Sequence, residues 1–319
     1  MKKTISKWLS ILIPLALGIA LIVYQYNSFT AQQLLEIKGY FKNANYFYIF
    51  LSLIIATFGF ISRAYRWKFS IEQMGYQSKF QNNLMAVCAC YFMNLSVPRS
   101  GEISRAIILK KYEDVPFDKA FGTIIAERVV DTILFFMFVI VAFILQFDIL
   151  KNFILETIPF KKLLILLVVG VVFFIGFVLI WIYSNWSIIN KLKQKLSGLI
   201  EGMTSILKME KKWAFLFHSF FIWFSYLMMF YITIFALKET SNIGFNAVII
   251  GFVFGTLAIG FTNSGFGAFP VLVAQIFMLY GISNTAGTAF GWLVWTSQTS
   301  LTIVLGGLSF LYLPIFNRK

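Results

Sequence analysis

Apolar runs long enough to cross a lipid bilayer recur along the whole chain. A membrane-spanning helix needs about 20 mostly apolar residues. Hydrophobic residues make up 59% of the 319 residues and charged residues only 13%, about half the charged share of a soluble domain. The sequence therefore predicts an all-α polytopic membrane protein, a single integral membrane domain over residues 1–319. We expect six full spans, at Lys7–Tyr26, Asn45–Arg63, Phe121–Phe147, Leu163–Tyr183, Ala214–Leu237 and Thr285–Tyr312.

Two further apolar stretches are interrupted, and we interpret them as re-entrant helical hairpins. Leu84–Val97 is short and runs into a turn at Pro98–Gly101. Val248–Asn263 is followed by a glycine-rich break and by Phe269–Tyr280. Interrupted segments at matching places in two halves are typical of inverted-repeat transporters. The alternative is that each stretch is an ordinary pair of kinked spans.

The distribution of basic residues predicts the orientation. With the N-terminus inside, 20 Lys and Arg residues lie on inner segments and six on outer ones, with Arg128 inside a span. Inner loops of membrane proteins carry the excess of Lys and Arg. We therefore expect a cell (inner) membrane protein with both termini in the cytoplasm.

One predicted span contains three charged residues, Glu127, Arg128 and Asp131. A charged side chain at mid-bilayer costs about 2.5–3.5 kcal/mol, so these groups must face protein or water. Glu127 and Asp131 share a helix face because they are four residues apart. The three groups together carry one negative charge, so a further cation is needed.

The first break supplies candidate cations. Arg99 and Arg105 bracket Gly101 and Glu102, and Arg105 shares a helical face with Glu102 if a helix resumes after the glycine. Guanidinium groups and the free N–H groups of a helix start suit a phosphate oxyanion. The alternative is a purely structural ion-pair network that fixes the hairpin to the charged span.

The breaks also contain candidate gate or hinge residues. Asn94 and Pro98 precede the turn of the first hairpin, and Asn263, Gly265 and Gly267 lie in the second. Glycines permit close backbone approach, and polar side chains cap the helix ends that a break frees. Ordinary helix interruption is the alternative for the second break.

These motifs resemble the flippase-like transmembrane domain of lysylphosphatidylglycerol synthases. The segments that carry the resemblance are N-L-S-V-P-R-S-G-E-I-S-R at 94–105, E-R-V-V-D at 127–131 and N-S-G-F-G-A-F-P at 263–270. The resemblance implies translocation of a lipid with a phosphate-bearing headgroup. It assigns substrate binding to the matching residues Arg99, Gly101, Glu102, Arg105, Glu127, Arg128 and Asp131.

The chain departs from the family at two points. Relatives often carry an acidic residue after the glycines of the third motif, where this chain has Ala268 and Phe269, so no acidic contact to a lysyl headgroup is expected. The 319 residues also contain no soluble aminoacyl-transferase domain, so we do not expect an enzyme.

We accordingly expect a lipid translocase whose partner is a membrane lipid with an anionic phosphate headgroup. Two alternatives stay open, a membrane-embedded lipid-modifying transferase and a non-transporting partner of an envelope enzyme. A homo-oligomer is open as well. Cys88, Cys90 and His218 make a poor metal site, so we expect no metal or cofactor, and the basic residues lie between apolar runs, which argues against a nucleic-acid partner.

The orientation can be tested by cysteine labelling. With Lys161→Cys in a variant lacking Cys88 and Cys90, we expect a membrane-impermeant maleimide to label intact cells from outside. Lys110→Cys, on an inner segment, is the matched control and should react only after permeabilisation. Labelling of Lys161→Cys from the cytoplasm alone would overturn the arrangement.

Overall fold

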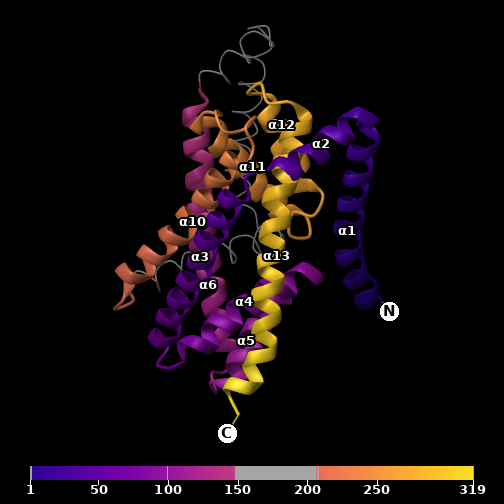
Figure 1. Ribbon diagram of the computed structural model, residues 1–319. Coiled ribbons are helices and arrows are strands. Elements are labelled where there is room, and N and C mark those ends of the chain that lie inside the picture. The colour runs from indigo at the N-terminus through magenta and orange to yellow at the C-terminus, as the bar shows by residue number, and fades with distance from the viewer. Residues whose placement is uncertain (1, 99, 148–205, 207, 319) are drawn as a thin grey trace, which may run out of the picture.

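The structure, a computed structural model, describes residues 2–98, 100–147, 206 and 208–318, and in these residues it is built from helices and their connections (Figure 1). The helices are α1 (Lys2–Ser28), α2 (Ala31–Asn43), α3 (Tyr46–Gln73), α4 (Phe80–Ser96), α5 (Ser100–Tyr112), α6 (Phe117–Leu145), α10 (Lys212–Thr233), the short 3₁₀ helix η1 (Ile234–Ala236), α11 (Phe245–Phe261), α12 (Ala268–Met278) and α13 (Asn284–Phe316).

Four of these helices are long and apolar enough to cross a membrane, namely α3, α6, α10 with η1, and α13. They coincide with four of the six predicted spans, and the predicted Lys7–Tyr26 lies within α1. The predicted span Leu163–Tyr183 lies outside the described residues. The chain is therefore an all-α polytopic membrane protein, as the sequence predicts.

The predicted end of the second span was wrong. The sequence places it at Arg63, but α3 continues for ten residues to Gln73. The apolar face of the helix persists through Ala64, Trp67 and Ile71, each fully buried. Charged residues interrupt that run without ending the helix, because Arg63 and Arg66 are paired inside the protein rather than exposed.

The two interrupted stretches form helical hairpins, α4–α5 and α11–α12, which enter the bundle from opposite ends. Helix α13 is about 50 Å long at 1.5 Å per residue. It contacts both hairpins, the second near its N-terminal end and the first nearer its C-terminal end. Gly287 and Gly291 pack against α12, Trp295 reaches the turn after α11, and Gly306 packs against α4. Near the C-terminus, Asn317 exchanges side-chain hydrogen bonds with Asn82, at the start of α4.

The hairpin tips meet between these contacts. The Asn263 side chain donates to the Leu95 carbonyl over 2.9 Å, and the Ser264 hydroxyl donates to the Asn94 carbonyl over 3.2 Å. Each hairpin therefore stops part of the way along α13, as a re-entrant element does. Irregular backbone is tolerated at membrane depth only where protein or a water-filled cavity surrounds it.

The order of elements repeats. A long helix, a hairpin and a long helix occur first as α3, α4–α5 and α6, and again as α10, α11–α12 and α13. Helices α3 and α10 run antiparallel, since Arg66 lies near Ser219, Ser62 near His218 and Asn45 near Ala236. This repeated order with opposed hairpins is the arrangement that an inverted repeat predicts.

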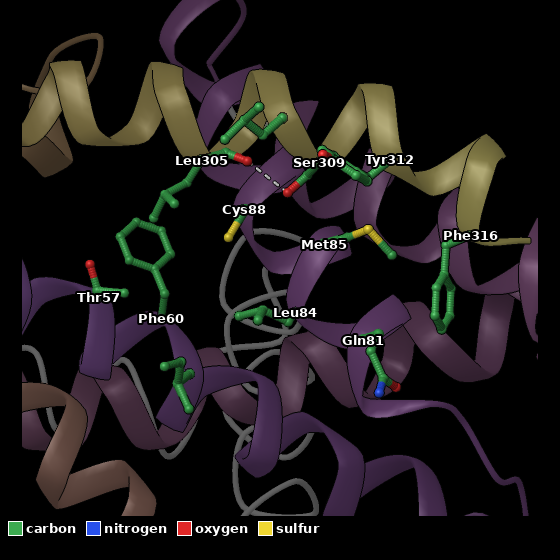
Figure 2. A pocket seen from close by; sticks show the side chains of 12 residues that line it. Thr57, Phe60, Gln81, Leu84, Met85, Cys88, Leu305, Ser309, Tyr312 and Phe316 are labelled. Carbon is green, nitrogen blue, oxygen red and sulfur yellow. Dashed lines mark hydrogen bonds between the residues drawn. The ribbon is translucent and has the colours of Figure 1, made fainter.

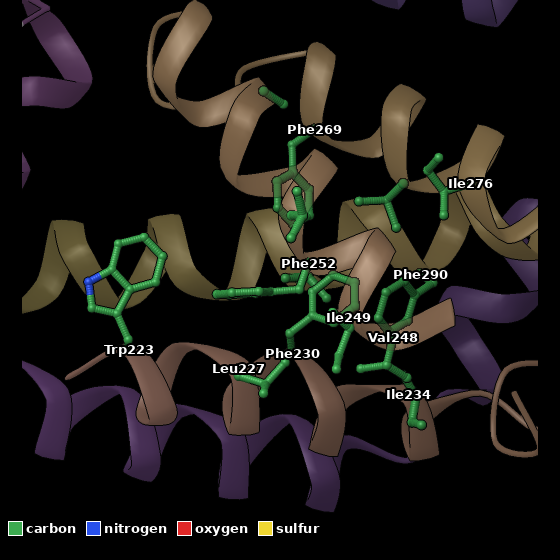
Figure 3. Close-up of a cluster of buried hydrophobic side chains, with 14 of the residues drawn as sticks. Trp223, Leu227, Phe230, Ile234, Val248, Ile249, Phe252, Phe269, Ile276 and Phe290 are labelled. Carbon is green, nitrogen blue, oxygen red and sulfur yellow. The ribbon is translucent and has the colours of Figure 1, made fainter. Parts of the chain in front are cut away.

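An aromatic core surrounds the second hairpin. The Phe230 ring packs edge-on against Phe252, Phe269, Phe277 and Phe290, with centroids 5.2–6.4 Å apart (Figure 3). Lipid tails are as apolar as these side chains, so close packing rather than water exclusion holds membrane helices together. Edge-to-face pairs of this kind contribute about 0.5–1.5 kcal/mol each.

The contact between the tips can be tested by cross-linking. In a background with Cys88→Ala and Cys90→Ala, we expect Leu95→Cys and Asn263→Cys to form a disulfide under mild oxidation, because the Asn263 side chain reaches the Leu95 carbonyl over 2.9 Å and the two residues therefore lie side by side. Mass spectrometry of a proteolytic digest would detect the bridge. Leu95→Cys with Leu272→Cys, further along the second hairpin, is the control pair that should stay reduced. Equal bridging of both pairs would argue against a defined tip contact.

Candidate functional site

A cluster of six charged side chains lies inside the bundle, and we call these residues the charge cluster. They are Arg63 and Arg66 of α3, Arg105 of α5, and Glu127, Arg128 and Asp131 of α6. Arg66 and Glu127 are completely buried. Glu127 is ten residues from the start of α6, about 15 Å along the helix. The helices that carry the cluster thus place it well inside the bundle.

Asp131 is held by both arginines of α3. Its carboxylate accepts from Arg66 through two hydrogen bonds of 2.6 and 3.1 Å, and from Arg63 over 3.2 Å. A guanidinium that grips a carboxylate with two parallel bonds fixes orientation as well as distance. Arg63 and Arg66 are three residues apart, so they share the face of α3 that meets α6.

Glu127 connects the first hairpin to this pair. It accepts from Arg105 over 2.8 and 3.4 Å, and Arg66 lies 3.7 Å away. The Arg105 guanidinium also stacks on the Trp67 ring at 3.7 Å from its centroid, and the Trp67 indole donates to Thr123 on α6. The hairpin, α3 and α6 are therefore fastened together by one ion-paired, stacked arrangement.

Neutral partners complete the shell around the arginines. Arg63 also donates to the Tyr226 hydroxyl over 3.1 Å. That hydroxyl lies 2.7 Å from the Tyr91 hydroxyl. Arg66 donates to Ser219 of α10 over 3.3 Å. The cluster thereby reaches four of the described helices besides α5, namely α3, α4, α6 and α10.

Arg128 differs from the other arginines. Its side chain is 42% exposed and lies 3.5 Å from Asp131, its nearest carboxylate among the described residues. The Nε atoms of all four arginines of the cluster are buried without a hydrogen-bond partner in the described part of the chain, so the exposure of its guanidinium is what sets Arg128 apart. Arg128 is thus the arginine of the cluster whose guanidinium a further anion can reach.

The cluster carries more positive than negative charge. Four guanidinium groups meet two carboxylates, and the half-buried Glu102 adds a third nearby on α5. The described residues therefore leave an excess of one positive charge even when Glu102 is counted. A buried charge that lacks a counterion is costly, so the arrangement favours an anionic guest.

The hairpin tips carry the predicted gate residues. The Asn94 side chain accepts from the Gly101 N–H over 2.8 Å and approaches Glu102 at 3.4 Å. Gly101 lies so close to the Cys90 carbonyl that no side chain fits there. Pro98 forms the connection between α4 and α5. This hairpin is therefore closed by its own polar residues.

The second tip turns through left-handed backbone at Ser264, Gly265 and Gly267, with φ of 53°, 80° and 71°. Gly267 also packs directly against Gly18 of α1, where a side chain would clash with backbone. The Trp295 indole donates to the Ser264 carbonyl over 2.9 Å. Asn263 keeps one buried side-chain oxygen without a partner among the described residues.

The structure brings together Arg105, Glu127, Arg128 and Asp131 of the predicted binding residues, and places Gly101 and Glu102 on the adjoining turn of α5. Arg99 lies outside the described residues. The prediction that the compensating cations come from the first hairpin alone was incomplete. Asp131 pairs with Arg63 and Arg66 of α3, as well as with Arg128 of its own helix. The sequence signal that could have identified these two arginines of α3 is their spacing of three residues, which places them on one helix face, followed by Trp67.

The fold and the site define a helical membrane protein with two opposed hairpins and a buried arginine–carboxylate cluster. The chain belongs to the family described as the lysylphosphatidylglycerol synthase TM region, which it matches over residues 11–307. It is 29% identical to a UPF0104 membrane protein of Methanocaldococcus jannaschii over 163 residues, which is 50% of this chain. The match covers 46% of that relative. No solved structure matches the chain.

The ion pair of Arg105 and Glu127 can be tested by a double-mutant cycle. Arg105→Met leaves Glu127 buried with only the more distant Arg66, so we expect a loss of about 3–5 kcal/mol in unfolding free energy. Adding Glu127→Gln should recover part of that loss. Thermal unfolding midpoints of the purified variants in detergent would report both effects.

The matched control is Arg128→Met, which removes a half-exposed guanidinium and should shift the midpoint much less. If Arg105→Met unfolds at the wild-type temperature, the pair does not stabilise the fold.

Proposed function

We propose that the protein translocates a membrane lipid with an anionic phosphate headgroup between leaflets, with both termini in the cytoplasm of the cell. The observation that carries the proposal is the excess of positive charge in the charge cluster, which lies between α3, α5 and α6. Ionisable residues inside the membrane are a functional site by default. Arginine presents planar donors that match phosphate oxygens.

Arg128 is the residue that we assign to the headgroup. Its half-exposed side chain distinguishes it from Arg63, Arg66 and Arg105, whose guanidinium groups are buried in ion pairs. The paired arginines hold the carboxylates, and the carboxylates in turn fix Arg128 at Asp131. A site preorganised in this way does not have to order its side chains when it binds.

The hairpin tips are suited to open and close a path. Two side-chain hydrogen bonds join them, from Asn263 and Ser264, and a typical bond of this kind contributes about 0.5–1.5 kcal/mol. The hairpins enter from opposite ends, so withdrawal of either tip would expose the centre to one side only. Alternating exposure of this sort is what transport between leaflets requires.

The second tip disfavours a cationic headgroup. Ala268 and Phe269 are buried apolar residues, and the described residues 262–270 contain no acid. An aminoacyl ammonium would therefore find no carboxylate there. We propose an anionic phospholipid or polyprenyl-phosphate-type lipid as the substrate, in preference to lysyl-phosphatidylglycerol.

Flipping can be measured in vesicles that contain the protein and a phospholipid with a headgroup-attached fluorophore. A membrane-impermeant reductant destroys only the dye in the outer leaflet. Flipping carries the inner-leaflet lipid outward, so the fluorescence that is otherwise protected is lost as well. We expect activity with phosphate-bearing lipid and its loss in Arg128→Ala. Lys38→Ala, which removes an exposed cation on α2, is the matched control and should flip normally.

Other outcomes discriminate between the alternatives. Equal flipping of a neutral glycolipid without phosphate would remove phosphate recognition, as would unchanged flipping in Arg128→Ala. Chemical conversion of the labelled lipid, seen by thin-layer chromatography, would favour a transferase. Absence of flipping and conversion with every lipid would favour a partner protein.

A further inference from the structure

A groove separate from the charge cluster runs between α3, α4 and α13. Its volume is about 410 Å³, within the range of sites that hold small ligands. Figure 2 shows residues of α4, such as Leu84 and Met85, lying between side chains of α3 and α13. The lining residues are Thr57, Phe60, Ile61, Gln81, Leu84, Met85, Cys88, Leu305, Leu308, Ser309, Tyr312 and Phe316.

Most of the groove is lined by apolar side chains. Of its three hydroxyl groups, those of Thr57 and Ser309 donate to carbonyls of their own helices at 2.8 and 2.7 Å, and the third belongs to the exposed Tyr312. Leu308 and Tyr312 are 46% and 57% exposed, so the groove opens to the exterior of the described bundle. Two of its helices, α3 and α13, have the length and composition of membrane spans. The apolar length of a membrane span is surrounded by hydrocarbon.

One end of the groove is polar and positively charged. Gln81 and Phe316 lie together at that end (Figure 2). The Lys79 ammonium lies 5.6 Å from the centroid of the Phe316 ring. Among the described residues no carboxylate forms an ion pair with this ammonium. The Glu113 carboxylate accepts from the Lys79 backbone N–H and from the Asn82 side chain. A basic residue at a helix end beside an apolar groove suits an anionic headgroup whose chain extends into the membrane.

An aromatic wall separates this groove from the charge cluster. Phe60 lines the groove and packs edge-on against Tyr91, with centroids 4.9 Å apart. On the cluster side the Arg63 guanidinium lies 5.7 Å from the centroid of the Tyr91 ring. A lipid in the groove therefore does not place its headgroup on the arginines.

We propose that this groove binds one acyl chain of a phospholipid with an anionic headgroup, and that Lys79 receives that headgroup. The chain lies along α4 between α3 and α13, with its far end near Thr57 and Leu305. This site is independent of the headgroup site at Arg128, because different residues and opposite faces of the Phe60–Tyr91 wall form the two.

Photo-cross-linking tests the proposal directly. The protein is reconstituted into phosphatidylcholine vesicles that contain a small share of phosphatidylglycerol with a diazirine in its acyl chain. After illumination, mass spectrometry of the digest locates the attached lipid. We expect cross-links to concentrate on groove residues, with Leu84, Met85 and Tyr312 as the main sites.

Leu308→Trp should abolish the groove cross-links, because the larger side chain fills the cavity. Leu311→Trp is the matched control on the outer face of α13, where the side chain is 65% exposed and does not line the groove, and it should leave them intact. Lys79→Gln should lower cross-linking by the phosphatidylglycerol probe towards the level of an equivalent phosphatidylcholine probe.

Cross-links spread evenly over the exposed apolar surface, or equal loss in the two tryptophan variants, would overturn the groove site. Equal cross-linking by both probes in the wild type would overturn the headgroup assignment to Lys79. Neither result depends on flipping, so failure here is distinguishable from failure of the proposed translocation.

Discussion

The packing of this protein depends on neutralising charge within the bundle. Arg63, Arg66, Arg105, Glu127 and Asp131 are all nearly or fully buried, and each is tolerable only because the others are in place. Removing one partner from such a set leaves an uncompensated buried charge. Helices α3, α5 and α6 are consequently fixed in one relative position. The first hairpin inherits that rigidity through Arg105.

The second hairpin is held by different forces. Aromatic packing around Phe230 and two hydrogen bonds at the tip attach it, and the described part of it has no ion pair. Aromatic contacts can slide or re-form with modest cost, whereas separating buried ions cannot be compensated by lipid. Of the two hairpins, α11–α12 is therefore the one whose displacement costs less energy. The two halves of the repeat thus have the same order of elements, but their hairpins differ in how rigidly they are held.

Hydropathy was sufficient to predict the helical class and four of the long helices, because bilayer thickness sets the length of a span directly. The two hairpins were predicted from the proline- and glycine-containing interruptions of two apolar stretches. The ion pair between Arg105 and Glu127 also followed from the need to compensate charge in a membrane helix. Arg63 and Arg66 were missed because hydropathy treats the first charge after an apolar run as the end of the span. Only tertiary contact with Asp131 distinguishes a paired arginine from one that faces the headgroups. The meeting of the hairpin tips was likewise not predictable, since it joins Asn263 to the backbone at Leu95, 168 residues away.

Helix α13 restricts how the chain can vary in length. Gly287, Gly291, Trp295, Gly306 and Asn317 each meet a different partner along it. Deleting one residue between the first and last of these would rotate every later side chain by about 100° and shift it by 1.5 Å. The glycine contacts would then be occupied by larger residues, and the asparagine pair at the far end would separate. Insertions and deletions in this protein should therefore be confined to the connections between helices, while the number of residues in α13 stays constant.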